Sequence, residues 1–452
     1  MGAFKEPDNK WFRSGGINGS PLPSGLNHIK LPNNPQIVTP ETAKRNGITD
    51  WKPGANNDIL PSPVLPTLPL ILSFNTELSG SANDTFILPL LKQVYDPTVN
   101  YNFTYEVKDS GGSIVDSGTH TSDAEIVING LIPGIYDIEI SAEDGNFGCI
   151  DFSGQVDKLK VTELKQWGSL QWNNQLEESN YVASFSSCTN LVLTATDKPN
   201  FNCLNLRSFF SGCTNLGGND NIIDISGYDL SAATTNRQFL VNIDLVTYIN
   251  ASNVKFSVGG IDENVAGMYN IFRLCDHAVT IDLTGADTSG VIGAKYAFQG
   301  ANDLANIVGF SDLDFSSCKT FEECFRLQSP QTPFAFNADM SNWNLGDSAE
   351  TFQRMYKNRT FEPGYFISGI ENLNPANLID DCFLEFLNGD IALTTASYDA
   401  LLIKMASYIG NYTITGKSFA MGGSQYTAGG AAEAAWNALD ADGWSIIDGG
   451  SI

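Results

Sequence analysis

The sequence is short of positive charge and of histidine. Its 452 residues include 25 lysines and arginines against 51 aspartates and glutamates, so the formal net charge is −26. No basic run and no basic stripe with interleaved aromatic residues is visible, which argues against a nucleic-acid partner. The acidic excess favours a soluble surface that holds divalent cations weakly at most. A chain of this length predicts two to four domains.

Metal-binding patterns and long apolar runs are also missing. The eight cysteines contain no Cys-x-x-Cys pair, and three histidines are too few for a zinc framework. We therefore expect reduced, buried, structural thiols and no cofactor. No apolar run reaches membrane-spanning length, and the first ten residues lack the apolar core of a secretory signal. These absences predict a protein made without Sec-type export and without membrane insertion.

What the sequence has is an abundance of small and turn-forming residues. Charged residues make up only 17% of the chain, and glycine alone accounts for 42 positions. This composition favours strands, turns and short repeats over long amphipathic helices. The predicted fold class is mainly β with short helices.

Residues 1–66 are rich in Pro, Asn and Gly and show no periodic apolar pattern. Their large apolar side chains are dispersed singly, which suits a strand-like arm that docks into grooves on a partner. A disordered tail is the alternative interpretation. The segment ends in a Pro-rich stretch at 60–69, which predicts a stiff linker. The residues that we expect to dock are Trp11, Phe12, Ile37, Val38 and Trp51.

Residues 67–162 alternate between apolar and polar side chains. The alternation is clearest from Leu70, from Tyr101, from Glu125 and from Tyr136. Period-two alternation over four to eight residues indicates half-buried strands. We predict a small Ig-like β-sandwich here, with no catalytic constellation inside it.

Residues 163–390 contain a short repeat anchored on phenylalanine. The segment Phe185-Ser-Ser-Cys-Thr-Asn-Leu191 returns as Phe210-Ser-Gly-Cys-Thr-Asn-Leu216, and weaker copies follow at intervals of about 25 to 33 residues. One copy cannot bury its own apolar face, so stacked copies are expected to place Phe on Phe in a continuous core. The predicted anchors are Phe185, Phe210, Phe239, Phe272, Phe298, Phe325, Phe352 and Phe383.

A second motif precedes several anchors. It begins at Asp224, at Asp282 and at Asp339, and each aspartate is followed by an apolar residue and then Ser or Thr. The apolar residue is expected to point inward from a short strand, while the aspartate forms a turn. Weak calcium binding at stacked aspartates is the alternative, although no dense oxygen-ligand spacing supports it.

These motifs resemble the BspA-type leucine-rich repeat. The best matches are residues 210–216 with 224–230, and residues 339–345; Tyr228 and Trp343 fall at the tryptophan position of the family. The domain before the repeats is similar to an Ig-like or PKD-like module, and residues 391–452 resemble the segment that closes such arrays. The resemblance implies an irregular leucine-rich-repeat solenoid with a C-terminal cap, a role in adhesion or display, and no enzyme activity.

The leading hypothesis for the function is a phage virion structural protein: a spike, tail fibre or capsid decoration. The arm would bind other virion proteins, the solenoid would meet a glycan or protein of the host surface, and a homo-oligomer is expected. A bacterial cell-surface adhesin is the alternative. A carbohydrate-active enzyme is a third possibility, for which Glu322-Glu323 and Asp380-Asp381 are the available acidic pairs. Adjacent carboxylates do not face each other, and the three histidines, His28, His120 and His277, are widely separated in the sequence.

Overall fold

The structure is a computed structural model of the chain. It describes residues 29–31, 34–38, 68–142, 146–176, 184–257, 267–327, 332–346, 348–389 and 391–452. The chain divides into two compact units, Met1–Thr67 and Leu68–Ile452. In the first unit, β1 (Ile29–Leu31) pairs with β2 (Asn34–Val38) in antiparallel fashion, with Ile29 opposite Val38. Of the predicted docking residues, Ile37 and Val38 lie in β2, and Trp11, Phe12 and Trp51 lie outside the described residues.

The second unit begins with a sheet that is antiparallel except at its β12 edge. From edge to edge its strands are β12 (Val192–Leu193), β10 (Val161–Gln166), β3 (Leu70–Asn75), β8 (Ile135–Ser141), β5 (Phe103–Asp109) and β6 (Ile114–His120). A two-stranded sheet pairs β4 (Phe86–Leu88) with β7 (Ile126–Ile128). The alternation that predicted strands is real: in β8, Tyr136, Ile138 and Ile140 are buried, and the residues between them are not. Each of the four alternating segments contains a strand, whereas β4, β6 and β10 were not predicted.

This sheet does not stop at the predicted boundary. Residue 162 lies inside β10, which pairs antiparallel with β3 on one side and parallel with β12, a strand of the repeat region, on the other. One connected hydrophobic core runs from Leu70 to Trp444. The alternating region and the repeats are therefore parts of a single folded unit.

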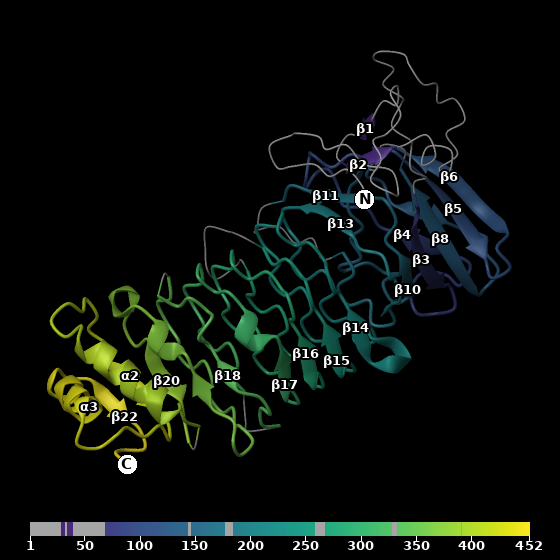
Figure 1. The fold of residues 1–452 in the computed structure, drawn as a ribbon. Coiled ribbons are helices and arrows are strands. Elements are labelled where there is room, and N and C mark those ends of the chain that lie inside the picture. Colours follow the sequence, from purple (N-terminus) through teal and green to yellow (C-terminus); the bar gives the residue numbers. More distant parts are fainter. Residues whose placement is uncertain are drawn as a thin grey trace, which may run out of the picture. The chain divides into compact units, whose positions relative to one another are not determined.

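The strands of the next three sheets are short and their pairing is parallel. They are β9 (Asn146–Phe147), β11 (Gln171–Asn174) and β13 (Asn200–Cys203) in one sheet, β14 (Ile222–Asp224), β15 (Tyr248–Asn250), β16 (Thr280–Asp282) and β17 (Asn306–Val308) in the next, and then the pair β18 (Ala338–Asp339) and β19 (Ile367–Ser368). Figure 1 shows β14 to β17 side by side in chain order. Ile223, Ile249, Ile281 and Ile307 stand opposite one another in register and are buried.

The phenylalanine-anchored turns also stack in register. All eight predicted anchors are buried. The Phe185 and Phe210 rings stack at 5.7 Å, and Phe298 stacks on Phe325 at 5.0 Å. A second column, four residues earlier in the turn, contains Phe321, Phe352 and Phe383.

The predicted anchors therefore do not all belong to the same column of stacked side chains. Phe352 and Phe383 lie in the second column with Phe321, whereas Phe325 stacks on Tyr356 at 5.2 Å. At the third turn, the Phe210 amide donates to the Phe239 carbonyl, the parallel pattern that sets Phe210 beside Leu240. The Phe239 ring stacks instead on the ring of Phe209.

The aspartates of the second motif form turns, as predicted. Asp224 accepts a hydrogen bond from the amide of Ser226 at 2.8 Å, and Asp282 does the same with Thr284 at 2.9 Å. Asp339 repeats the contact with Ser341 at 3.0 Å. Such side-chain acceptors stabilise a turn directly after a strand. The inward residues Ile225, Leu283 and Met340 are buried.

Two α-helices occur among the described residues, both near the C-terminus. The helix α2 (Thr395–Ala406) begins where the Thr394 side chain accepts from the Ser397 amide, and it packs against α3 (Ala431–Ala441). Single-turn 3₁₀ helices are η1 (Gly218–Asp220), η2 (Phe310–Asp312), η3 (Ile370–Asn372) and η4 (Pro375–Asn377). The last sheet has the order β20 (Phe383–Leu387), β21 (Ser418–Met421), β22 (Ser445–Ile447). The prediction of a mainly β fold is confirmed, although neither α2 nor α3 was located from the sequence.

Candidate binding pocket

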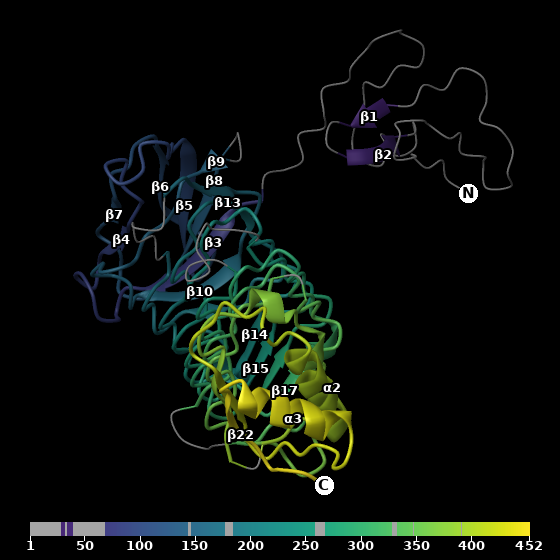
Figure 2. The same cartoon turned by 90° about the vertical axis from the view of Figure 1, so that its left-hand side faces the viewer.

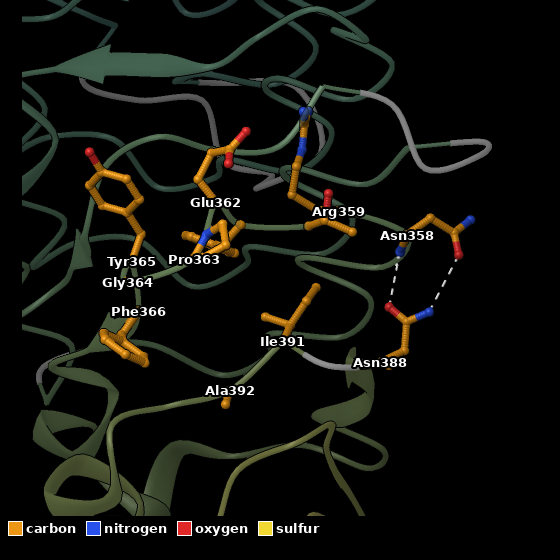
Figure 3. Close-up of a pocket in the computed structure, with 13 residues that line it drawn as sticks. Asn358, Arg359, Glu362, Pro363, Gly364, Tyr365, Phe366, Asn388, Ile391 and Ala392 are labelled. Carbon is orange, nitrogen blue, oxygen red and sulfur yellow. Dashed lines mark hydrogen bonds between the residues drawn. The ribbon is translucent and has the colours of Figure 1, made fainter.

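A pocket lies where the stacked turns meet the C-terminal helices and strands. It is lined by residues 358–366 of one turn and by Asn388, Gly389, Ile391 and Ala392 of the next, and its volume is about 480 Å³. Figure 3 shows Ile391 between the aromatic side chains of Tyr365 and Phe366 and the amide side chains of Asn358 and Asn388. Ligand pockets commonly enclose roughly 300–1,000 Å³. The pocket is therefore large enough for a small ligand or for a few units of a polymer.

A tight turn sets the aromatic wall of this pocket. In Glu362-Pro363-Gly364-Tyr365 the amide of Tyr365 donates to the Glu362 carbonyl at 3.1 Å, and Gly364 has φ +96°. Proline at the second position and a positive-φ glycine at the third are typical of a type II turn. The turn is fixed to the preceding repeat because the Glu362 amide donates to the Phe334 carbonyl at 2.8 Å.

The turn leaves two adjacent aromatic rings partly in solvent. Tyr365 is 38% exposed and Phe366 is 46% exposed, whereas the next residue, Ile367, is buried. Figure 3 shows the two rings diverging on the same side of the pocket. Aromatic side chains bury a large area at low entropic cost, and tyrosine adds a polar tip. These rings therefore offer two platforms for ligand contact.

The opposite wall is polar and is formed by a pair of amides. The backbone amide of Asn358 donates to Oδ1 of Asn388 at 3.0 Å, and Nδ2 of Asn388 donates to Oδ1 of Asn358 at 3.4 Å. Nδ2 of Asn358 donates in turn to the Leu327 carbonyl at 3.1 Å. The two side chains are thus held in place by neighbouring turns, and they present amide groups suited to hydroxyl ligands.

Arg359 belongs to the structural support of the pocket. Its guanidinium is buried and donates to the carbonyl oxygens of Ala301, Leu304, Phe325 and Thr332 at 3.0 to 3.4 Å. It also lies 4.3 Å from the centre of the Phe334 ring. Burial lowers the pKa of Arg359 to about 9, so the group remains charged at neutral pH. Figure 3 shows the side chain directed away from Ile391.

Three of the four carboxylates considered for an enzyme have structural partners. Glu322 pairs with Lys295 and Glu323 pairs with Arg326, each at 2.6 Å. Asp380 accepts from the amide and hydroxyl of Thr415 at 2.6 and 2.8 Å. Among the lining residues that the structure describes, Glu362 is the single carboxylate, whereas glycoside hydrolysis ordinarily requires two. Asp390, which stands between Gly389 and Ile391 in the sequence, lies outside the described residues. The pocket thus supplies stacking and hydrogen bonding.

The remaining predicted site residues lie elsewhere. Ring nitrogen Nε2 of His120 is 2.8 Å from the Ala124 carbonyl, and Nδ1 of His277 is 2.9 Å from Asp303, while His28 falls outside the described residues. Tyr228 and Trp343 are buried, and Trp167 donates to the Tyr228 hydroxyl at 2.9 Å. Sequence reasoning missed Tyr365 and Phe366, although two adjacent aromatics directly after Pro-Gly are a recognisable signal.

Metal-binding groups, membrane-spanning helices and known proteins do not assign a function to the chain. Within the ranges that the structure describes, no three His, Cys, Asp or Glu side chains are grouped so as to hold a metal ion. The described helices include none that is both long and apolar enough to cross a bilayer. No family model, curated protein or solved structure matches the chain.

Proposed function

We propose that the chain is a structural protein of a bacteriophage virion that carries a host-attachment surface. In this proposal residues 163–390 are a leucine-rich-repeat solenoid of the BspA type, residues 391–452 cap it, and residues 67–162 are an Ig-like spacer. Consecutive parallel strands in unbroken register, with one buried isoleucine per turn, support the solenoid. The resemblance of the repeat motifs supports the role in display.

The pocket carries the proposal of attachment. An exposed pair of rings faces an amide pair across an open hollow, and this combination suits the apolar faces and hydroxyl edges of a saccharide. The stacking rings and the amides of the described lining residues suit binding of a sugar, which needs no pair of carboxylates. Host-surface glycan is therefore the proposed ligand, and the protein is proposed not to be an enzyme.

Residues 1–66 are proposed to bind other virion proteins, and the particle is proposed to hold the chain as a homo-oligomer or in repeated copies. The test is the protein content of purified phage particles. We expect the chain in fixed stoichiometry, and we expect its loss from particles when residues 1–66 are deleted. Finding the full-length chain on intact bacterial cells and absent from particles would support the adhesin instead.

The pocket is tested by glycan-array binding of the purified chain. Tyr365→Ala with Phe366→Ala is expected to abolish binding, because both platforms are removed. Tyr95→Ala is the matched control, since Tyr95 is an exposed aromatic outside the pocket. Equal binding by the double variant would reject the pocket as the site, and release of shortened glycans would reject a purely binding role.

A further inference from the structure

One carboxylate of the pocket is left without a partner by the fold. Glu362 lines the pocket and is exposed. Among the residues that the structure describes, none donates a hydrogen bond to this carboxylate and none forms an ion pair with it. Glu385, in the following turn, differs because it lies 2.7 Å from both Arg354 and Lys357. The negative charge of Glu362 is therefore available to a ligand.

The backbone fixes Glu362 beside the aromatic wall. Its amide donates to the Phe334 carbonyl at 2.8 Å, and its own carbonyl accepts from the Tyr365 amide at 3.1 Å. Glu362 and Tyr365 are the first and fourth residues of the turn, so their Cα atoms lie within about 7 Å of each other. Figure 3 shows the carboxylate and the tyrosine ring directed to the same side of this turn. One ligand unit can therefore contact both groups.

A carboxylate next to exposed aromatic rings favours a cationic ligand. The ring faces of Tyr365 and Phe366 attract an ammonium group that lies within about 6 Å of a ring centre. The carboxylate adds a charge-assisted hydrogen bond, which is stronger than a bond between neutral groups. A hydroxyl group in the same place gains neither the full charge nor the contact with the ring. The combination therefore distinguishes an amine from a hydroxyl.

The positive charge of the pocket is not available to an acidic ligand. Arg359 is the single Lys, Arg or His among the described lining residues. Its guanidinium is buried and is engaged by the carbonyl oxygens of four residues. The net charge of the whole chain is −26, and such a field attracts cations and repels anions. Acidic sugars are thus disfavoured in this pocket.

We propose that the pocket binds a glycan unit that carries a protonated amine. The ammonium group lies against the Glu362 carboxylate, and the sugar ring lies against Tyr365. A hexosamine without an N-acetyl group is the simplest unit of this kind. The inference rests on the proposed function, because it names the class of glycan that the pocket takes.

A lysine side chain of a protein partner carries the same ammonium group but fits the pocket less well. Its stem is narrow and flexible, so it covers little of two adjacent rings and loses rotamer freedom on binding. A sugar ring is broad and already rigid. The glycan is therefore favoured, and a lysine peptide becomes one arm of the test.

The experiment compares three β-1,4-linked hexasaccharides that differ only at C2: glucosamine with free amines, N-acetylglucosamine, and glucose. Titration calorimetry of the full chain measures each affinity in a mildly acidic buffer that keeps the sugar amines protonated. We expect the glucosamine hexamer to bind about tenfold more tightly than the other two. Glu362→Gln retains the size of the side chain, so it should remove that advantage and leave the other two affinities unchanged.

Two further variants separate the pocket from general attraction to an acidic chain. Glu77→Gln changes the net charge by the same amount, at an exposed residue outside the pocket, and should leave the preference intact. Tyr365→Ala with Phe366→Ala keeps every charge and should abolish binding of all three hexamers. Binding of the glucosamine hexamer that survives in this double variant would come from charge alone and would overturn the inference.

Other outcomes distinguish this inference from the proposed function. Equal affinity of the wild-type chain for the three hexamers, lost in the aromatic double variant, would overturn the inference and leave the pocket as a glycan site. A preference that persists in Glu362→Gln, or that Glu77→Gln removes equally, would also overturn it, as would tighter binding of a lysine hexapeptide than of the glucosamine hexamer. No binding of any hexamer or of any glycan on the array would reject both.

Discussion

The antiparallel sheet and the parallel repeats of the second unit bury side chains in different ways. The strands β5 and β8 have seven residues each; in β8 every second residue is buried, and in β5 Phe103 and Val107 are buried on one face with Tyr105 partly buried between them. In β14 to β17 each strand has three residues, and the buried residue packs on the same position of the next turn. In the sheet the burial pattern is a feature of each strand's own sequence. In the repeats it depends on equivalent residues of successive turns. The sheet therefore tolerates an irregular sequence better than the repeats do.

Aspartates have different surroundings in the two regions, although the repeats also bury the charged Arg359. In the sheet region Asp157 and Lys160 are both fully buried and bind one loop: Asp157 accepts from the amides of Ser81 and Ile87, and Lys160 donates to carbonyls of the same loop. In the repeats, aspartates such as Asp282 remain near the surface and each accepts from its own turn. Replacing Asp157 should therefore cost more stability than replacing an aspartate of a repeat turn.

The largest effect is expected at the buried ion pair of the sheet region. Asp157→Ala leaves the Lys160 ammonium buried without its 3.6 Å carboxylate partner and removes three hydrogen bonds. Breaking a buried pair costs about 3–5 kcal/mol of unfolding free energy. The exposed pair of Asp229 with Lys255 is the matched comparison, and Asp229→Ala should cost about 1 kcal/mol or less. Chemical denaturation measures both; equal costs would contradict the division.

Phe352→Ala probes the stacked column. Its ring lies between Phe321 and Phe383 at 5.4 and 5.6 Å, and removing a buried phenylalanine costs about 3–5 kcal/mol. The damage should remain local, because each turn contacts mainly its neighbours. Hydrogen exchange should accelerate in the turns at 321 and 383 while β3 and β8 keep their protection. A uniform loss of protection would show that the two regions unfold together.

Two glycines with similar φ angles differ in their surroundings: one lies against the neighbouring turn, and the other lies in an open hairpin. Gly309 has φ +78°, and a Cβ there would lie 2.8 Å from the Thr284 amide nitrogen of the preceding turn. Gly112, in the β5–β6 hairpin, has φ +79° and nothing within 4 Å. Gly112→Ala should cost about 1–2 kcal/mol from the left-handed backbone alone. Gly309→Ala should lower the melting temperature further, and an equal shift would argue that neighbouring turns do not press on each other.

The smallest effect concerns an exposed histidine between two turns. Hydrogen bonding to Asp303, with further help from Asp276 and Asp244, raises the pKa of His277 above its ordinary value of 6.5. The stabilisation is therefore complete below pH 6.5 and is lost as the pH rises through the raised value. Asp303→Asn should lower the unfolding free energy in that acidic range by less than about 1 kcal/mol, because the pair is solvent-screened. An NMR titration checks this: an unchanged His277 pKa in the variant would refute it.

Local patterns in the sequence were sufficient for part of the fold. Alternation located β3, β5, β7 and β8, but β6 reads Ile-Val-Asp-Ser-Gly-Thr-His and gives no such signal, because an edge strand is largely exposed. The phenylalanines were sufficient to find the repeat, but they did not show which phenylalanine of one turn stacks on which phenylalanine of the next. Pairs such as Phe209-Phe210 and Phe321–Phe325 offer two candidates per turn, and only the stacking contacts decide between them.

The candidate sites were predicted less well. Tyr365 and Phe366 follow a Pro-Gly pair that specifies their turn, so the aromatic wall was accessible to sequence reasoning. Contacts between neighbouring turns were not accessible in this way. The Arg237 guanidinium lies 4.5 Å from the centre of the Tyr269 ring, although the two residues are 32 positions apart in the sequence.

The eight cysteines are free and buried, and burial raises the thiol pKa at Cys188, Cys213, Cys275 and Cys318. A thiol that is covered and protonated does not react with alkylating reagents. Because Cys188, Cys213, Cys275, Cys324 and Cys382 are distributed through successive turns, the order in which they become alkylated under mild denaturant would record where the array opens first. The wild-type chain thus contains its own set of chemical probes for the spread of unfolding from turn to turn.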